Sequence, residues 1–113
     1  MGIIQKIRMD MAHAPTPDDI AKLNDRLTLI QIRAGALIHE ACKRNNLDSN
    51  SSCLVSDLKY LSEKSMHNLA FCSKCIEERE YASARDFFRK AELQAKNMEL
   101  KAEKLTEILR KRG

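Results

Sequence analysis

The sequence predicts an all-α protein, an antiparallel bundle of three long helices joined by short connections. Apolar residues recur at alternating intervals of three and four along most of the chain, which is typical of helices with coiled-coil-like packing. The 113 residues include only three Gly and two Pro, and both Pro fall within the first 17 residues. A turn-rich β fold is therefore disfavoured. Aromatic residues make up 4% of the chain, which suits a thin core of aliphatic side chains and Ala.

We divide the chain into an N-terminal segment, residues 1–16, and a helical bundle, residues 17–113. The first segment carries apolar residues on one side of a possible helix, which predicts a short helix or a tail docked on the bundle. These residues are Ile3, Ile4, Ile7 and Met11. Two prolines near its end disfavour helix just before residue 17.

The first long helix is predicted over residues 17–45. Thr16 reads as its N-cap, Pro17 as its first residue, and Asp18 and Asp19 as acids near the positive end of the helix dipole. Gly35 lies inside this helix at a cost of about 1 kcal/mol relative to Ala, so we expect a partner helix to approach closely there. The apolar seam consists of Ile20, Leu23, Leu27, Ile30, Ala34, Leu37 and Ala41.

The second helix is predicted over residues 52–78, after a loop of Asn and Ser residues at 45–52. The sequence leaves open where this helix ends. A tight turn at 78–81 would give an antiparallel hairpin, whereas a helix running from 52 to 112 would be ~90 Å long and would force dimerisation.

The third helix, residues 81–112, carries the most regular seam. Its members are Ala84, Phe88, Ala91, Ala95, Met98, Ala102, Leu105 and Leu109. Within residues 68–92, the spacing of Tyr81, Ala84, Phe88 and Ala91 resembles the second helix of a tetratricopeptide repeat, and the same turn is similar to that of microtubule-interacting-and-trafficking domains. This resemblance implies a helical hairpin.

The four cysteines do not form a convincing metal or redox site. Cys72 and Cys75 have the two-residue spacing of a zinc pair, but a structural zinc needs four ligands. We expect these two to pack as small hydrophobes. Cys42 and Cys53 flank the first loop and could form a disulfide in an oxidising compartment, although the default is reduced thiols. We expect no metal and no cofactor.

We expect a non-enzymatic interaction module, an adaptor, chaperone or assembly subunit. It would bind a partner's amphipathic helix, or a second copy of itself as a homodimer, because the helices carry more apolar residues than their seams need. The candidate partner-binding residues are Ile32, Ile38, Phe87 and Leu93. No apolar run is long enough to span a membrane, and no secretory signal is evident, so we expect a cytoplasmic protein.

Two other functions remain open. The formal net charge of +4 is concentrated in the last helix, so the alternative is a small nucleic-acid-binding subunit. Its contact residues would be Arg85, Arg89, Lys96, Arg110, Lys111 and Arg112. The third possibility follows from Arg33 and His39, whose spacing resembles the R-x(4 to 6)-H pattern of HEPN-superfamily nucleases.

Overall fold

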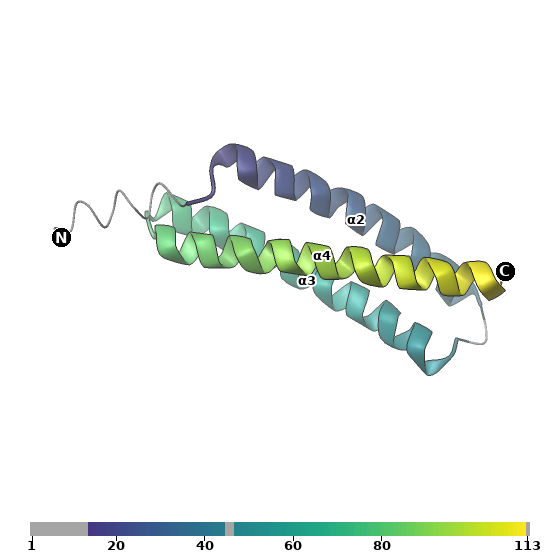
Figure 1. Ribbon diagram of the computed structural model, residues 1–113. Coiled ribbons are helices and arrows are strands. Elements are labelled where there is room, and N and C mark those ends of the chain that lie inside the picture. The colour runs from purple at the N-terminus through teal and green to yellow at the C-terminus, as the bar shows by residue number, and fades with distance from the viewer. Residues whose placement is uncertain (1–13, 45–46, 113) are drawn as a thin grey trace.

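The computed structural model describes residues 14–44 and 47–112, and it is a bundle of three helices (Figure 1). They are α2 (Pro17–Lys43), α3 (Ser49–Glu77) and α4 (Tyr81–Arg112). The predicted all-α fold is confirmed. The N-terminal apolar residues 3, 4, 7 and 11 lie outside the described residues. None of the described helices combines the length and the hydropathy needed to cross a bilayer.

The bundle is a rod rather than a sphere. It measures 62 × 22 × 18 Å and has a radius of gyration of 17.7 Å. A compact chain of this length would have a radius of gyration of ~13 Å. The excess follows from helices of 27 to 32 residues laid side by side with short connections.

The N-terminus of α2 is capped as predicted. The backbone N–H of Asp19 donates to Thr16 Oγ1 at 3.1 Å, and the backbone N–H of Thr16 donates to Asp19 Oδ2 at 3.0 Å. This reciprocal capping box satisfies N–H groups that a helix end leaves without partners. The hydrogen bonds from Thr16, first that of its backbone N–H and then that of its side chain, lower the pKa of the Asp19 carboxyl.

Helix α3 begins at Ser49, three residues before the predicted start at 52. The sequence predicts a loop for these Ser and Asn residues because their side chains compete for backbone hydrogen bonds. Asp48 overrides this tendency, because its Oδ1 accepts the backbone N–H of Ser51 at 2.7 Å and caps the helix.

The turn between α3 and α4 exists, so the hairpin is formed and the single long helix is not. Arg79 adopts φ = 62°, the left-handed conformation that terminates many helices. The N–H of Glu80 donates to the carbonyl of Cys75 at 2.8 Å, and that of Arg79 donates to Ile76 at 3.1 Å. These two bonds form a Schellman motif, with Arg79 at the position that Gly usually occupies.

Helices α3 and α4 are antiparallel and pack along most of their length. Their contact contains fully buried alanines of α4, whose small side chains allow a close approach between the helices. These are Ala84, Ala91, Ala95 and Ala102. Lys101 pairs with Asp57 at 2.9 Å, and Asn68 donates to Gln94 at 2.8 Å, so polar bonds run along one edge of the same contact.

Helix α2 runs parallel to α4. Arg26 pairs with Glu99 at 2.6 Å, and Arg33 donates to Thr106 at 3.5 Å, so the same sequence offset separates both pairs. The hydrogen bond with Glu99 raises the pKa of Arg26. Helix α2 meets its two neighbours at fewer positions than they meet each other, and Figure 1 shows it lying beside the α3–α4 pair.

Candidate partner-binding groove

A groove runs between α2 and α3. Its first hollow, of about 520 Å³, lies beside the N-terminal half of α2 and the C-terminal half of α3. Most of its lining side chains are apolar or small. The lining residues are Pro17, Ile20, Ala21, Asn24, Met66, Leu69, Ala70, Ser73 and Ile76.

A second hollow, of about 380 Å³, continues the first along the same two helices. Met66 lines both hollows, so we treat them as one feature, the α2–α3 groove. The other lining residues are Gln31, Ala34, Gly35, Ile38, Leu58, Lys59, Ser62, Glu63 and His67. From Pro17 to Ile38 the groove is ~30 Å long at 1.5 Å per residue, which is the length of a helix of about 20 residues.

Gly35 is the residue at which the backbone of α2 is open to the groove. A Cβ placed on it would meet no described atom within 4 Å. The lack of a side chain at Gly35 is therefore not required by packing within the described chain. A glycine in the middle of a helix costs about 1 kcal/mol relative to Ala, so the chain carries a local cost that its own fold does not explain.

The polar groups of the groove include a bond between the two helices and charged side chains of both signs. Gln31 Nε2 donates to the carbonyl of Ser62 at 3.4 Å and links α2 to α3. Lys59, Glu63 and His67 line the second hollow, and they supply charge of both signs. The apolar first hollow and the mixed second hollow together suit an amphipathic ligand.

The four predicted partner-binding residues lie on three different surfaces. Ile38 lines the groove. Ile32 is on the outer side of α2 with 66% of its surface exposed, and it does not line either hollow. Phe87 and Leu93 belong to α4, where Leu93 is 60% exposed and Phe87 contacts the ring of Phe71. The structure therefore does not bring the four together into one site.

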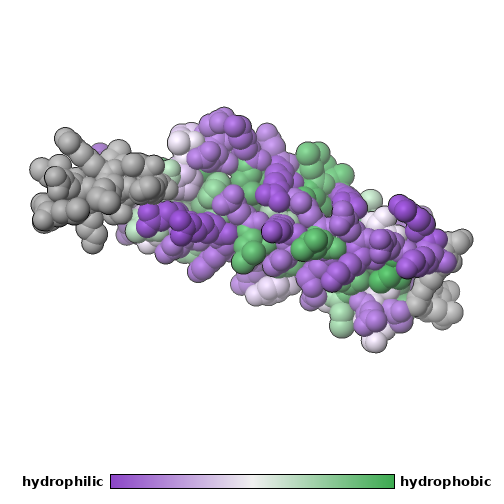
Figure 2. Space-filling model, in the orientation of Figure 1, coloured by the Kyte–Doolittle hydropathy of each residue, from purple (hydrophilic) through white to green (hydrophobic). Residues whose placement is uncertain are grey.

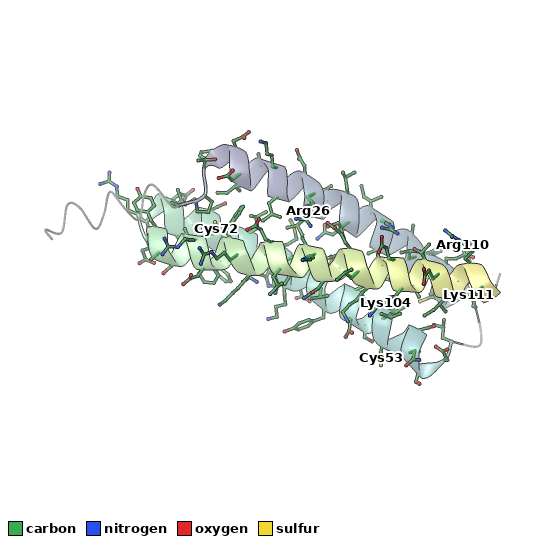
Figure 3. The ribbon with its side chains drawn as sticks, in the orientation of Figure 1. Arg26, Cys53, Cys72, Lys104, Arg110 and Lys111 are labelled. Carbon is green, nitrogen blue, oxygen red and sulfur yellow. The ribbon has the colours of Figure 1, made fainter. Side chains whose placement is uncertain are left out.

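The residues predicted to contact nucleic acid all lie on α4, but acids separate them. Spacings of four and seven residues put Arg85, Arg89 and Lys96 along one side of the helix. On the same side of the helix, the acids Glu103 and Glu107 lie between Lys96 and Arg110. Lys111, like Arg110, lies in the last turns of α4 (Figure 3). Lys96, Arg110 and Lys111 are exposed, and the side chain of Arg112 lies outside the described residues.

Arg33 and His39, the pair that resembles the nuclease pattern, point in different directions. Six residues on a helix correspond to a separation of about 120° around the axis. Arg33 faces α4 through its bond with Thr106, whereas His39 is exposed elsewhere on α2.

Cys72 and Cys75 are buried as predicted and pack with Ala84 at the α3–α4 corner. Figure 3 places Cys72 within the bundle and Cys53 at its surface. Burial raises the pKa of the Cys72 thiol to about 11, so it is neutral near pH 7. Cys42 and Cys53 are exposed free thiols. Among the described residues, no group of three or more His, Cys, Asp or Glu side chains could hold a metal ion.

Sequence reasoning missed most of the groove. Ala21, Asn24 and Ser73 line it, yet they are small or polar and fall outside every apolar seam. Gly35 was the one available signal, but the close approach of a helix that it predicted is not seen among the described residues, since no described atom lies within 4 Å of a Cβ placed there.

Comparisons of the chain with protein-family models, with curated proteins and with solved structures find no match in any of the three.

Proposed function

We propose that the protein is a non-enzymatic helical interaction module that binds an amphipathic helix of a partner protein in the α2–α3 groove. Adaptors, chaperones and assembly subunits act in this way, because an apolar groove recognises the apolar face of a helix. The partner helix would form the fourth member of the bundle and lie against both α2 and α3. The exposed free thiols Cys42 and Cys53 suit a reducing compartment such as the cytoplasm.

The observation that carries this proposal is Gly35. It lines the groove, it has no described neighbour that would collide with a side chain, and it costs helix stability. The space left by the absent side chain would allow the backbone of an incoming helix to approach α2 closely. The length of the groove, which matches about 20 helical residues, indicates what kind of segment would fill it.

The test begins with amphipathic helical peptides of about 20 residues, selected from a displayed library for binding to the full chain. Titration of the methionine methyl groups by NMR then locates the binding site. The methyl signal of Met66, which lines both hollows, should shift, whereas that of the fully buried Met98 should shift little. Shifts confined to residues of α4 would refute the groove as the site.

Matched substitutions complete the test. Gly35→Leu should weaken peptide binding by about tenfold or more, because the new side chain enters the groove. Ala36→Leu adds a larger side chain at the next, exposed position, outside the residues that line the hollows, and should leave affinity unchanged. Circular dichroism should show equal helicity for both variants. Equal affinities for the two variants would contradict the proposal.

A further inference from the structure

A second surface lies across the contact between α3 and α4. It is distinct from the groove, because its residues do not line either hollow of that groove. Four large apolar side chains are exposed on it. These are Tyr60 at 60%, Phe71 at 50%, Leu93 at 60% and Leu100 at 49% of their surface.

The antiparallel register sets the levels of these four exposed side chains along the rod. Leu93 and Leu100 are about two helical turns apart on α4, and Tyr60 and Phe71 are about three turns apart on α3. The bond from Asn68 to Gln94 and the Lys101–Asp57 ion pair fix the levels at which the helices meet. Tyr60 therefore lies near the level of Leu100, and Phe71 lies at the level of Phe87, about two turns of α4 before Leu93.

Lysines accompany the apolar side chains. Lys64 Nζ lies 5.7 Å from the centroid of the Tyr60 ring, and Lys90 Nζ lies 5.5 Å from that of Phe87. The Phe87 ring is itself 5.4 Å from that of Phe71. We call this surface, with Lys104 one turn beyond Leu100, the lysine–aromatic face.

The face continues into a hollow of about 400 Å³ near the N-terminus of α3. Its lining residues are Asn50, Cys53, Leu54, Lys104, Glu107 and Ile108. Figure 3 shows Cys53 and Lys104 at this end of the bundle, and Figure 2 shows separate hydrophobic patches among hydrophilic residues over α4. The hollow offers space for an apolar anchor.

We propose that the lysine–aromatic face binds a second partner helix that is amphipathic and acidic. Leu93, Leu100, Tyr60 and Phe71 would cover its apolar side, and Lys64, Lys90 and Lys104 would face its carboxylates. Asp57, the carboxylate that lies at the contact between α3 and α4, is already neutralised by Lys101. Lys64, Lys90 and Lys104 outnumber the exposed acids on the stripe of Leu93 and Leu100, which are Asp86 and Glu107, so the face has a small positive excess.

An acidic helix fits this face better than single-stranded nucleic acid does. Nucleic-acid strands use aromatic rings as stacking platforms for bases. Here a lysine lies over the rings of Tyr60 and Phe87, Phe71 leaves a single ring for stacking, and Leu93 and Leu100 offer aliphatic contacts.

The probe is a fluorescent peptide of about 18 residues, ~27 Å long as a helix, with Leu at heptad positions a and d, Ala at e and Glu elsewhere. Fluorescence anisotropy with the full chain should detect binding that weakens as salt is raised. A peptide with Lys in place of Glu should bind at least about tenfold more weakly. Equal binding of the two peptides would overturn the charge argument.

Two matched comparisons locate the site. Leu93→Ser and Leu100→Ser should each weaken binding about tenfold, while Ile32→Ser, on an equally exposed apolar residue of α2, should not. Bound peptide should also slow alkylation of Cys53, in the hollow, but not of Cys42 on α2. Loss of binding in Gly35→Leu with Leu100→Ser unaffected would place the peptide in the α2–α3 groove and overturn this inference alone.

Two further titrations test whether the lysine–aromatic face binds a nucleic acid or a membrane surface instead. Oligouridylate, and vesicles of phosphatidylcholine with phosphatidylserine, are titrated against the same chain and variants. Binding of either ligand that depends on Leu100, with no binding of the acidic peptide, would assign the face to nucleic acid or to a membrane surface and overturn the proposal.

Discussion

The α3–α4 hairpin is more closely packed than the contacts of helix α2 with its two neighbours. In the hairpin, alanines alternate with Leu and Met at fully buried positions, and polar bonds run along one edge of the contact. Helix α2 buries a shorter set, including Leu23, Leu27 and Ile30, and a groove remains between it and α3. The difference indicates that the hairpin carries most of the stability and that α2 is the more loosely packed wall of the α2–α3 groove.

The largest expected effect belongs to the hairpin. Leu105 is fully buried in α4, so Leu105→Ala should lower the free energy of unfolding by about 2–5 kcal/mol. Ile30→Ala in α2 should cost less, because α2 packs less extensively against its neighbours than α3 and α4 pack against each other. Urea unfolding of both variants measures the two values, and a larger loss at Ile30 would reverse the comparison.

Cysteine reactivity reports the same contrast without changing the core. Cys42 on α2 is exposed and should react with iodoacetamide at least about tenfold faster than Cys72, which is buried and neutral. Mass spectrometry of chain quenched at successive times measures both rates. Similar alkylation rates for Cys42 and Cys72 would mean that the α3–α4 corner opens often enough to expose Cys72 to the reagent.

The same thiol predicts how stability depends on alkaline pH. Burial raises the pKa of Cys72 from its ordinary value of 9.0 to about 11, so the folded state holds a proton that the unfolded state loses. This contribution is fully present below pH 9 and is lost as pH rises toward 11. The Tm of Cys72→Ala should therefore fall less than that of wild type over this range.

Gly35→Ala should sharpen the comparison by strengthening α2. The new methyl group meets no described atom within 4 Å, and Ala favours helix over Gly by about 1 kcal/mol, so the free energy of unfolding should rise. Ala36→Gly, at the adjacent exposed position, should lower it by a similar amount. A fall with Gly35→Ala would mean that a close contact exists at this position.

Arg79→Gly should strengthen the hairpin by a smaller amount. The left-handed conformation costs a residue with a Cβ about 1–2 kcal/mol, and Gly avoids this strain. Gly in turn loses more conformational entropy on folding, which costs about 0.5–1 kcal/mol. We expect a net gain of up to about 1 kcal/mol in thermal or urea unfolding. A loss would indicate that the Arg79 side chain itself stabilises the turn.

The smallest effect concerns the start of α2. The pKa of Asp19 is lowered by its bonds with Thr16, so its contribution is present above the ordinary pKa of 3.8 and is lost as pH falls through the lower folded value. Asp19→Asn should therefore flatten the acid side of a Tm profile. An unchanged profile would show that the capping box does not contribute in solution.

The sequence predicted helices more readily than surfaces. Thr16 and Pro17 marked the start of α2, because local backbone chemistry determines that point. The start of α4 at Tyr81 belonged to one of two alternatives that the sequence left open. Asp48 was missed because a single capping side chain decided the start of α3 within a run of loop-forming residues. Local signals of this kind extend over only a few residues.

The groove and the lysine–aromatic face depend on how whole helices are rotated about their axes. Ile32 and Ile38 both flank the same seam, yet one is exposed and the other lines the groove. Periodicity identifies the seam, but it does not say which flanking residue a third helix will cover. That choice follows from the sum of weak contacts along α2 and α4.

The parallel course of α2 and α4 has a mechanical consequence. With three passes along a rod 62 Å long, residue 17 and residue 112 lie at opposite ends (Figure 1). A tension applied between these two residues would load the helix contacts in shear along their whole length instead of peeling one helix from its end. Bodies attached at the two ends would be held apart by a stiff strut.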